Sequence, residues 1–299
     1  MLADEATSVH QTNLESLSSL SEGNIDQFNL AWASLSIDRK KKILDELTNL
    51  CELDIAMDFS QIFLIGISDK NSLIREASVV GLWESNDRMI IKPLTELLRD
   101  DPSNPVRQAA AMTLATFTRR SQEGKLIHRD YQQIRESLLH AIEDESSDID
   151  TKRRSIETIA HFGSSGIEDI ILDAHKGYDS KLRQSAIYAM GRTSETRWIK
   201  LLIESLDDPD PAIRYETASS LGELGDETII PYLTELLTDD DTEVKASAIR
   251  SLGQIGGSSA KQTISDYLDD EDSIIKESAI SAMKIIRFEE NPLGFHENL

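Results

Sequence analysis

The segment IRYETASSL at residues 213–221 returns 31 residues later as VKASAIRSL at 244–252, and again as IKESAISAM at 275–283. In each copy a basic residue stands second, and small or aliphatic residues recur every three or four positions, which is the pattern of an amphipathic helix. Four earlier segments have the same form: IREASVVGL (74–82), VRQAAAMTL (106–114), TKRRSIETI (151–159) and LRQSAIYAM (182–190). This regular recurrence predicts a repeat protein.

The spacing between the basic residues of successive segments, here called anchors, gives the length of the repeat. The anchors are Arg75, Arg107, Lys152, Arg183, Arg214, Lys245 and Lys276, at spacings of 32, 45, 31, 31, 31 and 31 residues. Since 45 equals 31 plus 14, one repeat is expected to carry an insertion near residues 119–132. The insertion holds four Lys or Arg against two acids, so it is either a solvated loop or lengthened helix, or part of a binding face.

Each repeat is predicted to be a pair of helices. In the sixth copy IIPYLTELL (229–237) has helical apolar spacing, acids follow at 239–241, and the second helix begins near Val244. Glycines stand eleven residues after three anchors, at Gly163, Gly225 and Gly256, where a left-handed helix cap is expected. One pair cannot bury both of its apolar stripes, so we expect seven pairs to stack around one continuous core, in an all-α solenoid.

An aspartate stands six residues before most anchors, in the predicted turn between the two helices. It is present at Asp69, Asp101, Asp208, Asp239 and Asp270, whereas Ser146 and Gly177 take this place in the third and fourth copies. The turn aspartate, the hydrophobe-Arg pair and the Leu-Gly near the helix end resemble HEAT repeats, particularly the short HEAT-like repeats first associated with phycobilin lyases. The resemblance covers roughly residues 58–287. It implies a right-handed superhelix of about seven hairpins, with the second helices along its concave wall.

The chain is expected to have four parts. They are a flexible leader (1–23), an N-terminal helical cap (24–57), the repeat array (58–287) and a loose tail (288–299). The basic run at residues 39–42 suits the polar outer face of a cap, and contact with an acidic partner is the alternative. Trp83 stands where later repeats have Ala or Gly, and we expect it to pack over the cap.

Composition limits the possible functions. Lys and Arg total 31 against 54 Asp and Glu, which gives a net charge of −23 and opposes broad nucleic-acid binding. Cys51 is the single cysteine, so an internal disulfide framework is excluded and a reducing compartment is favoured. Because no run approaches 18 apolar residues, no membrane span is predicted, and a cytoplasmic protein is expected.

The sequence contains no recognisable catalytic motif. HEAT-like deoxyhypusine hydroxylases hold two irons through several His-Glu pairs, whereas the one His-Glu sequence here is His296-Glu297. The acids at 207–210 and 239–243 lack the glycine and glutamate of a calcium loop, and are expected to cap helices. No cofactor, metal or enzymatic activity is predicted. The anchors are expected to pair with turn aspartates and so to position neighbouring repeats, with a ligand-binding stripe as the alternative.

The anchors and the positions one, five and nine residues after them point away from the predicted packing stripe. We call their surface the second-helix face. The candidate recognition residues on or beside it are Gln184, Tyr188, Arg192, Trp198, Tyr215 and Arg250. Tyr and Arg are common at binding hot spots. The leading hypothesis is a scaffold that binds a protein or peptide with a basic face. The alternative is a chromophore-handling protein similar to phycobilin lyases. A third possibility resembles the HEAT-like alkyl-purine DNA glycosylases, but the net negative charge of the chain opposes DNA binding.

Overall fold

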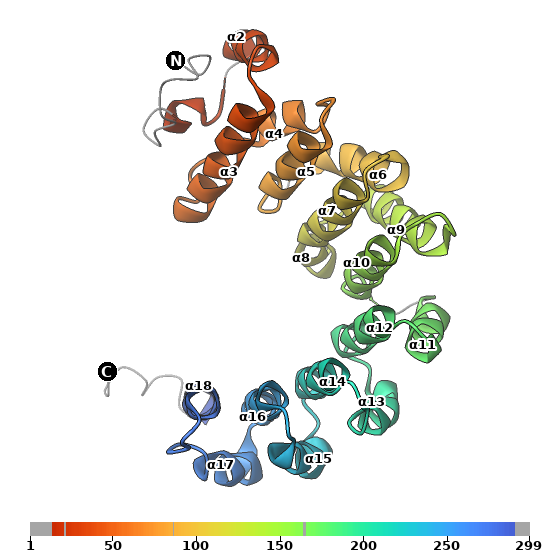
Figure 1. The fold of residues 1–299 in the computed structure, drawn as a ribbon, viewed down its shortest axis with the longest axis vertical. Helices are drawn as coiled ribbons and strands as arrows, with labels where there is room; N and C mark the ends of the chain where they lie inside the picture. Colours follow the sequence, from red (N-terminus) through yellow and green to blue (C-terminus); the bar gives the residue numbers. More distant parts are fainter. Residues whose placement is uncertain (1–13, 21, 86, 164–165, 291–299) are drawn as a thin grey trace. The chain divides into compact units, whose positions relative to one another are not determined.

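A computed structural model describes residues 14–20, 22–85, 87–163 and 166–290, and every secondary-structure element among them is helical (Figure 1). The fold is all-α, as predicted. Contacts divide the chain into two compact units, Met1–Phe162 and Gly163–Leu299, and each is described by itself. The predicted leader up to residue 13 and the tail from residue 291 lie outside the described residues. None of the described helices is long and apolar enough to cross a bilayer.

Unit 1 contains three hairpins of the array and the two helices expected in the cap. The cap helices are α2 (Glu22–Ala33) and α3 (Ile37–Leu53), preceded by a short 3-10 turn, η1 (Glu15–Leu17). The hairpins are α4 (Ser60–Gly66) with α5 (Ser72–Gly81), α6 (Ile91–Asp100) with α7 (Asn104–Leu114), and α9 (His128–Glu143) with α10 (Ile149–Ala160). Shorter pieces are η2 (Arg88–Ile90), η3 (Ala115–Phe117) and α8 (Thr118–Gln122).

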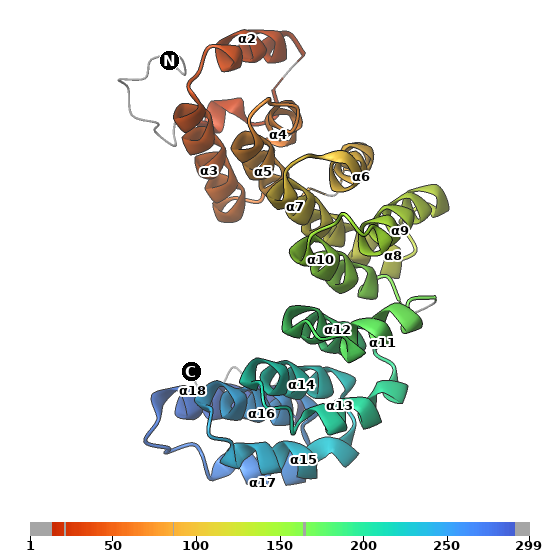
Figure 2. The same ribbon diagram turned by 45° about the vertical axis from the view of Figure 1, so that its right-hand side comes forward.

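Unit 2 contains the other four hairpins. They are α11 (Glu168–Lys176) with α12 (Ser180–Arg192), α13 (Ile199–Ser205) with α14 (Pro211–Leu224), α15 (Ile230–Glu235) with α16 (Thr242–Ile255), and α17 (Gly257–Ser265) with α18 (Ser273–Glu290). The 3-10 turns η4 (Thr196–Trp198), η5 (Glu227–Ile229) and η6 (Leu236–Thr238) flank α13 and α15. In both views the second helices α12, α14, α16 and α18 form one layer and the first helices form another (Figure 2). Each unit is therefore a stretch of α-solenoid.

Acidic and amide side chains begin the second helices. Asp210 accepts a hydrogen bond from the amide of Ala212 (3.0 Å) at the start of α14, and Asp241 accepts from Glu243 (2.9 Å) at the start of α16. The same place, four residues before the anchor, is filled by Asn71, Asp148 and Asp179. These side chains satisfy amides that the first helical turn leaves unpaired. Two of the acids that were tested as calcium ligands, Asp210 and Asp241, are therefore helix caps.

Glycines end two of the second helices with positive φ angles. Gly225 closes α14 at φ 67°, in the left-handed conformation predicted for it. Gly256 closes α16 at φ 72° but with ψ −157°, which lies outside the left-handed helical region. Both conformations are strained for residues with a Cβ, so glycine is required at these helix ends.

A repeated hydrogen bond joins successive second helices. The hydroxyl six residues after an anchor donates to the carbonyl four residues after the preceding anchor. The pairs are Thr113–Val79 (3.2 Å), Thr158–Ala111 (3.0 Å), Ser220–Ile187 (3.0 Å) and Ser251–Ala218 (2.8 Å). All four hydroxyl-bearing residues are buried, so each bond fixes the register of one helix on the next.

Close helix approach in unit 2 depends on glycine eight residues after the anchor. A Cβ on Gly253 would lie 2.5 Å from the Cβ of Ala282, and one on Gly222 would lie 2.6 Å from the Cβ of Ser251. Neither distance is tolerable between carbon atoms. The small residues noted at this position are thus required by the packing of α14, α16 and α18.

Two segments differ from what the sequence suggested. The described part of the leader is packed, because Leu14 is 1% exposed and Ser18 accepts a hydrogen bond from the Asp58 amide (3.0 Å). The insertion near 119–132 folds into α8 and the first turn of α9. Within it, Asp130 is buried and accepts a hydrogen bond from Arg88 (2.6 Å), which lowers the pKa of this carboxyl. The insertion is therefore held against the preceding hairpin.

Candidate functional site

Arg214 fastens its own turn to the turn of the next repeat. Its Nε and Nη2 donate to the carboxylate of Asp239 at 2.7 and 2.8 Å, and Nη1 donates to the carbonyl of Asp208 at 2.8 Å. Arg75 makes the same two-bond contact with Asp101, at 2.7 and 2.8 Å. Both pairs are largely buried, with Arg214 16% and Asp239 7% exposed. The planar guanidinium matches the carboxylate, so this contact fixes orientation as well as distance.

The ion pair also sets the protonation of its members. The hydrogen bond from Arg214 lowers the pKa of Asp239 below its ordinary value, although burial of the carboxyl acts in the opposite direction. The same bond raises the pKa of Arg214. Both groups are therefore charged at neutral pH, and the contact is a true ion pair.

Two further ion pairs join neighbouring repeats in the same way, and one of them begins in the cap. Arg183 pairs with Asp208 between α12 and the turn before α14. Lys40 on α3 pairs with Asp69 at 2.6 Å, and its ammonium also lies 5.3 Å from the ring centre of Trp32. The lysine side chain is 13% exposed. Lys40 therefore acts as an anchor, although its basic run was expected to form the polar outer face of the cap.

The third repeat uses a different turn residue from the one placed by counting. Asp144, not Ser146, forms the turn, since its carboxylate accepts the Ser146 amide at 2.9 Å. The hydrogen bond from the Ser146 hydroxyl, together with that from its amide, lowers the pKa of Asp144 to about 2. Arg107 lies 3.5 Å from Asp144 and donates to the hydroxyl of Ser147 at 2.6 Å. The loop is two residues longer here, so the six-residue count missed the aspartate.

The lysine anchors do not repeat the arginine geometry. Lys276 lies 3.5 Å from Asp269, within its own repeat. Lys152 and Lys245 form no ion pair with any acid among the described residues. An ammonium group is a single point charge without the arginine fork, which is consistent with looser contacts at these positions. Asp270 instead accepts the amide of Asp272 at 2.8 Å and shapes its turn.

Most of the candidate recognition residues lie on the second-helix face of unit 2, and they contact one another. The Arg192 guanidinium lies 4.9 Å from the ring centre of Tyr188 and 2.8 Å from Glu223. Arg250 lies 5.8 Å from the ring centre of Tyr215 and donates to its hydroxyl at 3.4 Å. Burial raises the pKa of Glu223, and Arg192 offsets part of this effect. Two stacked Arg-Tyr pairs therefore stand on α12 and across α14 and α16.

Gln184 and Trp198 complete the candidate set in different ways. Gln184 donates to Glu216 at 3.4 Å, between α12 and α14 on the same face. Trp198 is 4% exposed and donates through its indole nitrogen to the Thr193 hydroxyl at 2.9 Å. Its ring is part of the core and has no surface for a partner. We therefore remove Trp198 from the candidate site and keep the other five residues.

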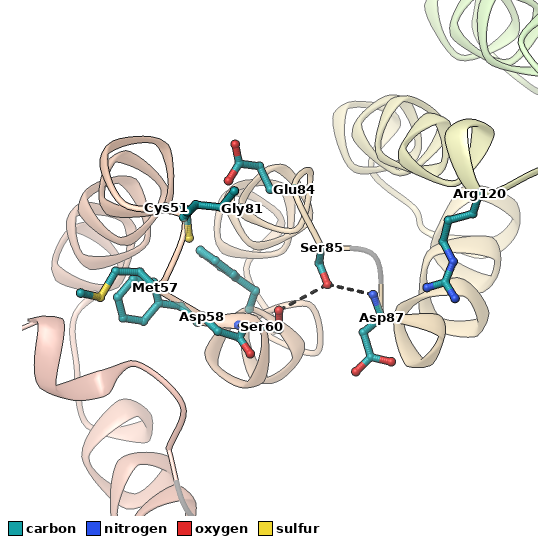
Figure 3. Close-up of a pocket in the computed structure, with 12 residues that line it drawn as sticks. Cys51, Met57, Asp58, Ser60, Gly81, Glu84, Ser85, Asp87 and Arg120 are labelled. Carbon is teal, nitrogen blue, oxygen red and sulfur yellow. Dashed lines mark hydrogen bonds between the residues drawn. The ribbon is translucent and has the colours of Figure 1, made fainter. Parts of the chain in front are cut away.

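A cavity of about 700 Å³ lies in unit 1, at the ends of α3 and α5. Cys51, Asp58 and Glu84 line one end of it, and Arg120 points in from α8 beside Asp87 at the other (Figure 3). Burial raises the pKa of the Cys51 thiol, and the negative charges of Glu84 and Asp58 raise it further. The thiol is thus protonated at neutral pH, which argues against a nucleophilic role.

The described residues contain no group of three or more His, Cys, Asp or Glu side chains that could hold a metal ion. The sequence pair His296-Glu297 lies outside the described residues. The features that the sequence did not reveal are Lys40, Asp144 and the cavity. A buried lysine in a basic run resembles a solvated one in sequence, and a cavity depends on the packing of distant segments.

Known proteins were compared with this chain by sequence and by structure. The family model for HEAT repeats matches residues 199–284, and the model for a HEAT repeat matches residues 90–121. The fold is similar to that of YibA from E. coli, with a TM-score of 0.53 and 15% identity over 95% of this chain and 98% of that one. It is also similar to the complex of CpcE and CpcF of phycocyanin lyase from Nostoc sp., with a TM-score of 0.54 and 14% identity over 95% of this chain and 96% of that one. No curated protein matches the sequence.

These findings agree with the helical hairpins described above. Residues 199–284 span the last three hairpins, and residues 90–121 span the hairpin of α6 and α7. At 14 and 15% identity, the similarity to solved structures concerns the fold alone. Repeats of this kind commonly provide extended surfaces for protein interactions. The chain therefore contains HEAT repeats, at residues 90–121 and 199–284.

Proposed function

We propose that this protein is a non-catalytic scaffold that holds a protein or peptide segment along its second-helix face. The observation that carries the proposal is the pair of stacks, Arg192 on Tyr188 and Arg250 on Tyr215. Arg and Tyr are enriched at binding hot spots, and stacking holds them in fixed positions before a partner arrives. A preorganised surface of this kind loses little side-chain entropy on binding.

The partner is proposed to carry a basic face. The chain has 54 acids and 31 basic residues, and many of the basic ones are held in the internal pairs described above. The free carboxylates therefore dominate the field around the protein. Such a field speeds the approach of a basic partner and disfavours acidic ones, nucleic acids included.

Capture of partners from cell extract on the immobilised full chain tests this proposal. A basic protein retained at low salt should be released at about 0.5 M NaCl, because screening then acts within about 4 Å. Its affinity should fall about tenfold when Tyr188 and Tyr215 are both replaced by Ser, since each loses a hot-spot ring. The matched control is Tyr232→Ser on α15, a first helix, where the tyrosine is 41% exposed. Equal affinity of the control and the double variant would refute the assignment to this face.

The alternative is a chromophore-handling role, which is suggested by the fold similarity to the CpcE–CpcF complex. Bilins carry two propionate groups, whereas Asp58 and Glu84 line the end of the cavity away from Arg120. These two carboxylates would repel the propionates, so the charge at this end disfavours the role. Mixing the purified protein with biliverdin tests it, because a shift of the visible absorbance would support the alternative and an unchanged spectrum would remove it.

A further inference from the structure

Three apolar side chains in unit 1 form an exposed patch, with Val80 on α5, Trp83 in the turn after α5 and Met112 on α7. Val80 is 45% exposed, Trp83 is 44% exposed and Met112 is 51% exposed. Trp83 follows Val80 by one turn, and its amide donates to the Val80 carbonyl at 3.0 Å. Because the Thr113 hydroxyl donates to the Val79 carbonyl, Met112 on α7 lies beside Val80 on α5. We call these three residues the apolar patch.

The patch stands at positions that are small or polar elsewhere in the array. Val80 and Met112 lie five residues after their anchors, where later repeats have Glu157, Tyr188, Ser219, Arg250 and Ser281. Trp83 was expected to pack over the cap, but nearly half of its surface faces solvent. Large apolar side chains clustered on an acidic surface indicate an interaction site, since scattered ones need no explanation.

The carboxylate of Glu84 joins the apolar patch to the cavity described above. Glu84 follows Trp83 directly and lines the cavity together with Cys51 and Asp58 (Figure 3). Neither Glu84 nor Asp58 forms an ion pair with any basic residue in the described part of the chain. The Asp58 carboxylate accepts the Ser60 amide, at 2.9 Å. This end of the cavity therefore holds two uncompensated negative charges.

The shape and chemistry of the cavity suit a long cationic side chain. Phe59 and Phe63 line it but are each only 1% exposed, so the more exposed carboxylates of Glu84 and Asp58, not the rings, are the groups that an entering cation meets. Arg120 stands at the opposite end, beside Asp87, so the negative end is the one near Glu84. A volume of about 700 Å³ is ample for one such side chain and its neighbours.

We propose that unit 1 binds an extended segment of the partner protein in which Arg or Lys stands next to a large aliphatic residue. The cation enters the cavity between Glu84 and Asp58, and the aliphatic side chain covers Val80, Trp83 and Met112. This inference rests on the proposed scaffold function, and it adds the location and the chemistry of one binding site. The opposite charge of the segment and the acids selects this occupant over an acidic or purely apolar one.

The three tryptophans provide a direct test on the full chain. Trp32 and Trp198 are each 4% exposed, so a neutral quencher such as acrylamide reaches chiefly Trp83. The probe is an acetylated and amidated peptide, Ser-Leu-Arg-Leu-Gly-Ser, and its matched control carries Glu in place of Arg. The Arg peptide should reduce quenching at least twofold in a saturable manner, and the Glu peptide should have no effect. Equal protection by both peptides, or by neither, would overturn the proposal.

Two variants separate the cavity from the patch. Glu84→Gln removes the charge and should weaken the Arg peptide about tenfold, while Met112→Ser should weaken it about fivefold through lost apolar contact. The matched control is Glu96→Gln on α6, a carboxylate that is 56% exposed on a first helix. A Glu84→Gln protein that binds as tightly as the Glu96→Gln control refutes the site. If the captured basic partner still binds both variants normally, the scaffold function stands and this location alone is wrong.

Discussion

Breaking the contact between Arg214 and Asp239 should destabilise unit 2 more than any exposed ion pair would. Arg214→Met keeps the aliphatic stem but removes two charge-assisted bonds to Asp239 and one to the Asp208 carbonyl. Asp239, 7% exposed, would then be buried without a counter-ion. The expected loss is about 2–4 kcal/mol in the free energy of unfolding. The exposed pair Arg99–Asp100 should contribute at most about 0.5 kcal/mol.

A double-mutant cycle isolates the pairwise term. Arg214→Met, Asp239→Asn and the double variant are unfolded in urea at pH 7 and followed by circular dichroism and tryptophan fluorescence. Asn retains the oxygen that accepts the Asp241 amide (2.8 Å), so the turn is preserved. The coupling energy should be about 1.5–3 kcal/mol. A coupling energy no larger than that of the Arg99–Asp100 cycle would refute the claim that these buried ion pairs position neighbouring repeats.

The coupling should also depend on pH. The pKa of Asp239 is lower in the folded chain than its ordinary value near 3.8, chiefly because Arg214 donates to it. The unfolded chain therefore binds the proton first, and the stabilisation is fully present above about pH 5. It should fade as the pH falls below about 4 and through the folded pKa. Equal coupling at pH 7 and 5 with a smaller value near pH 3 is the expected profile.

Three further outcomes are expected. Gly253→Ala should lower the free energy of unfolding in urea by about 1–3 kcal/mol, because its Cβ would lie 2.5 Å from Ala282. The control is Gly23→Ala, whose Cβ would have no atom within 4 Å, and it should be neutral or stabilising. Trp198→Ala should cost about 3–5 kcal/mol by thermal unfolding yet leave partner affinity per folded molecule unchanged, since the ring is buried. Burial lowers the pKa of His175, so unit 2 should lose stability as the pH falls from 7.5 to 5.5. His175→Gln should reduce this dependence of the urea midpoint on pH. Equal slopes of midpoint against pH for the two proteins would contradict the prediction.

Much of the fold could be predicted because the repeat imposes the same physical requirements seven times. The spacing of the anchors placed all seven hairpins, and Gly225 marked a helix end through its positive φ. Each feature is local, since it depends on residues within one helix or one turn. A pattern repeated along the chain then reveals what a single copy would leave uncertain.

The features that were missed depend on contacts between distant segments. Lys40 lies in a run of four basic residues, and only its contact with Asp69, 29 positions later, distinguishes it from its neighbours. Asp144 was overlooked because one turn is longer by two residues. Trp198 and Trp83 exchange their expected environments, the first buried and the second exposed. Aromatic residues suit both a core and a binding surface, so their type alone does not decide.

The central claim is that a partner binds along the second helices. Zero-length cross-linking of carboxylates to amines in the complex with the captured partner tests this claim most directly. The reaction joins Asp and Glu of this chain to lysines of the partner that lie in contact. The scaffold account predicts that the bonds fall on acids of the proposed binding surfaces, such as Glu84 in the turn after α5 and Glu216 on α14, and that about 0.5 M NaCl abolishes them. Bonds confined to first-helix acids such as Glu96 and Glu235, or a yield unaffected by salt, would contradict the account.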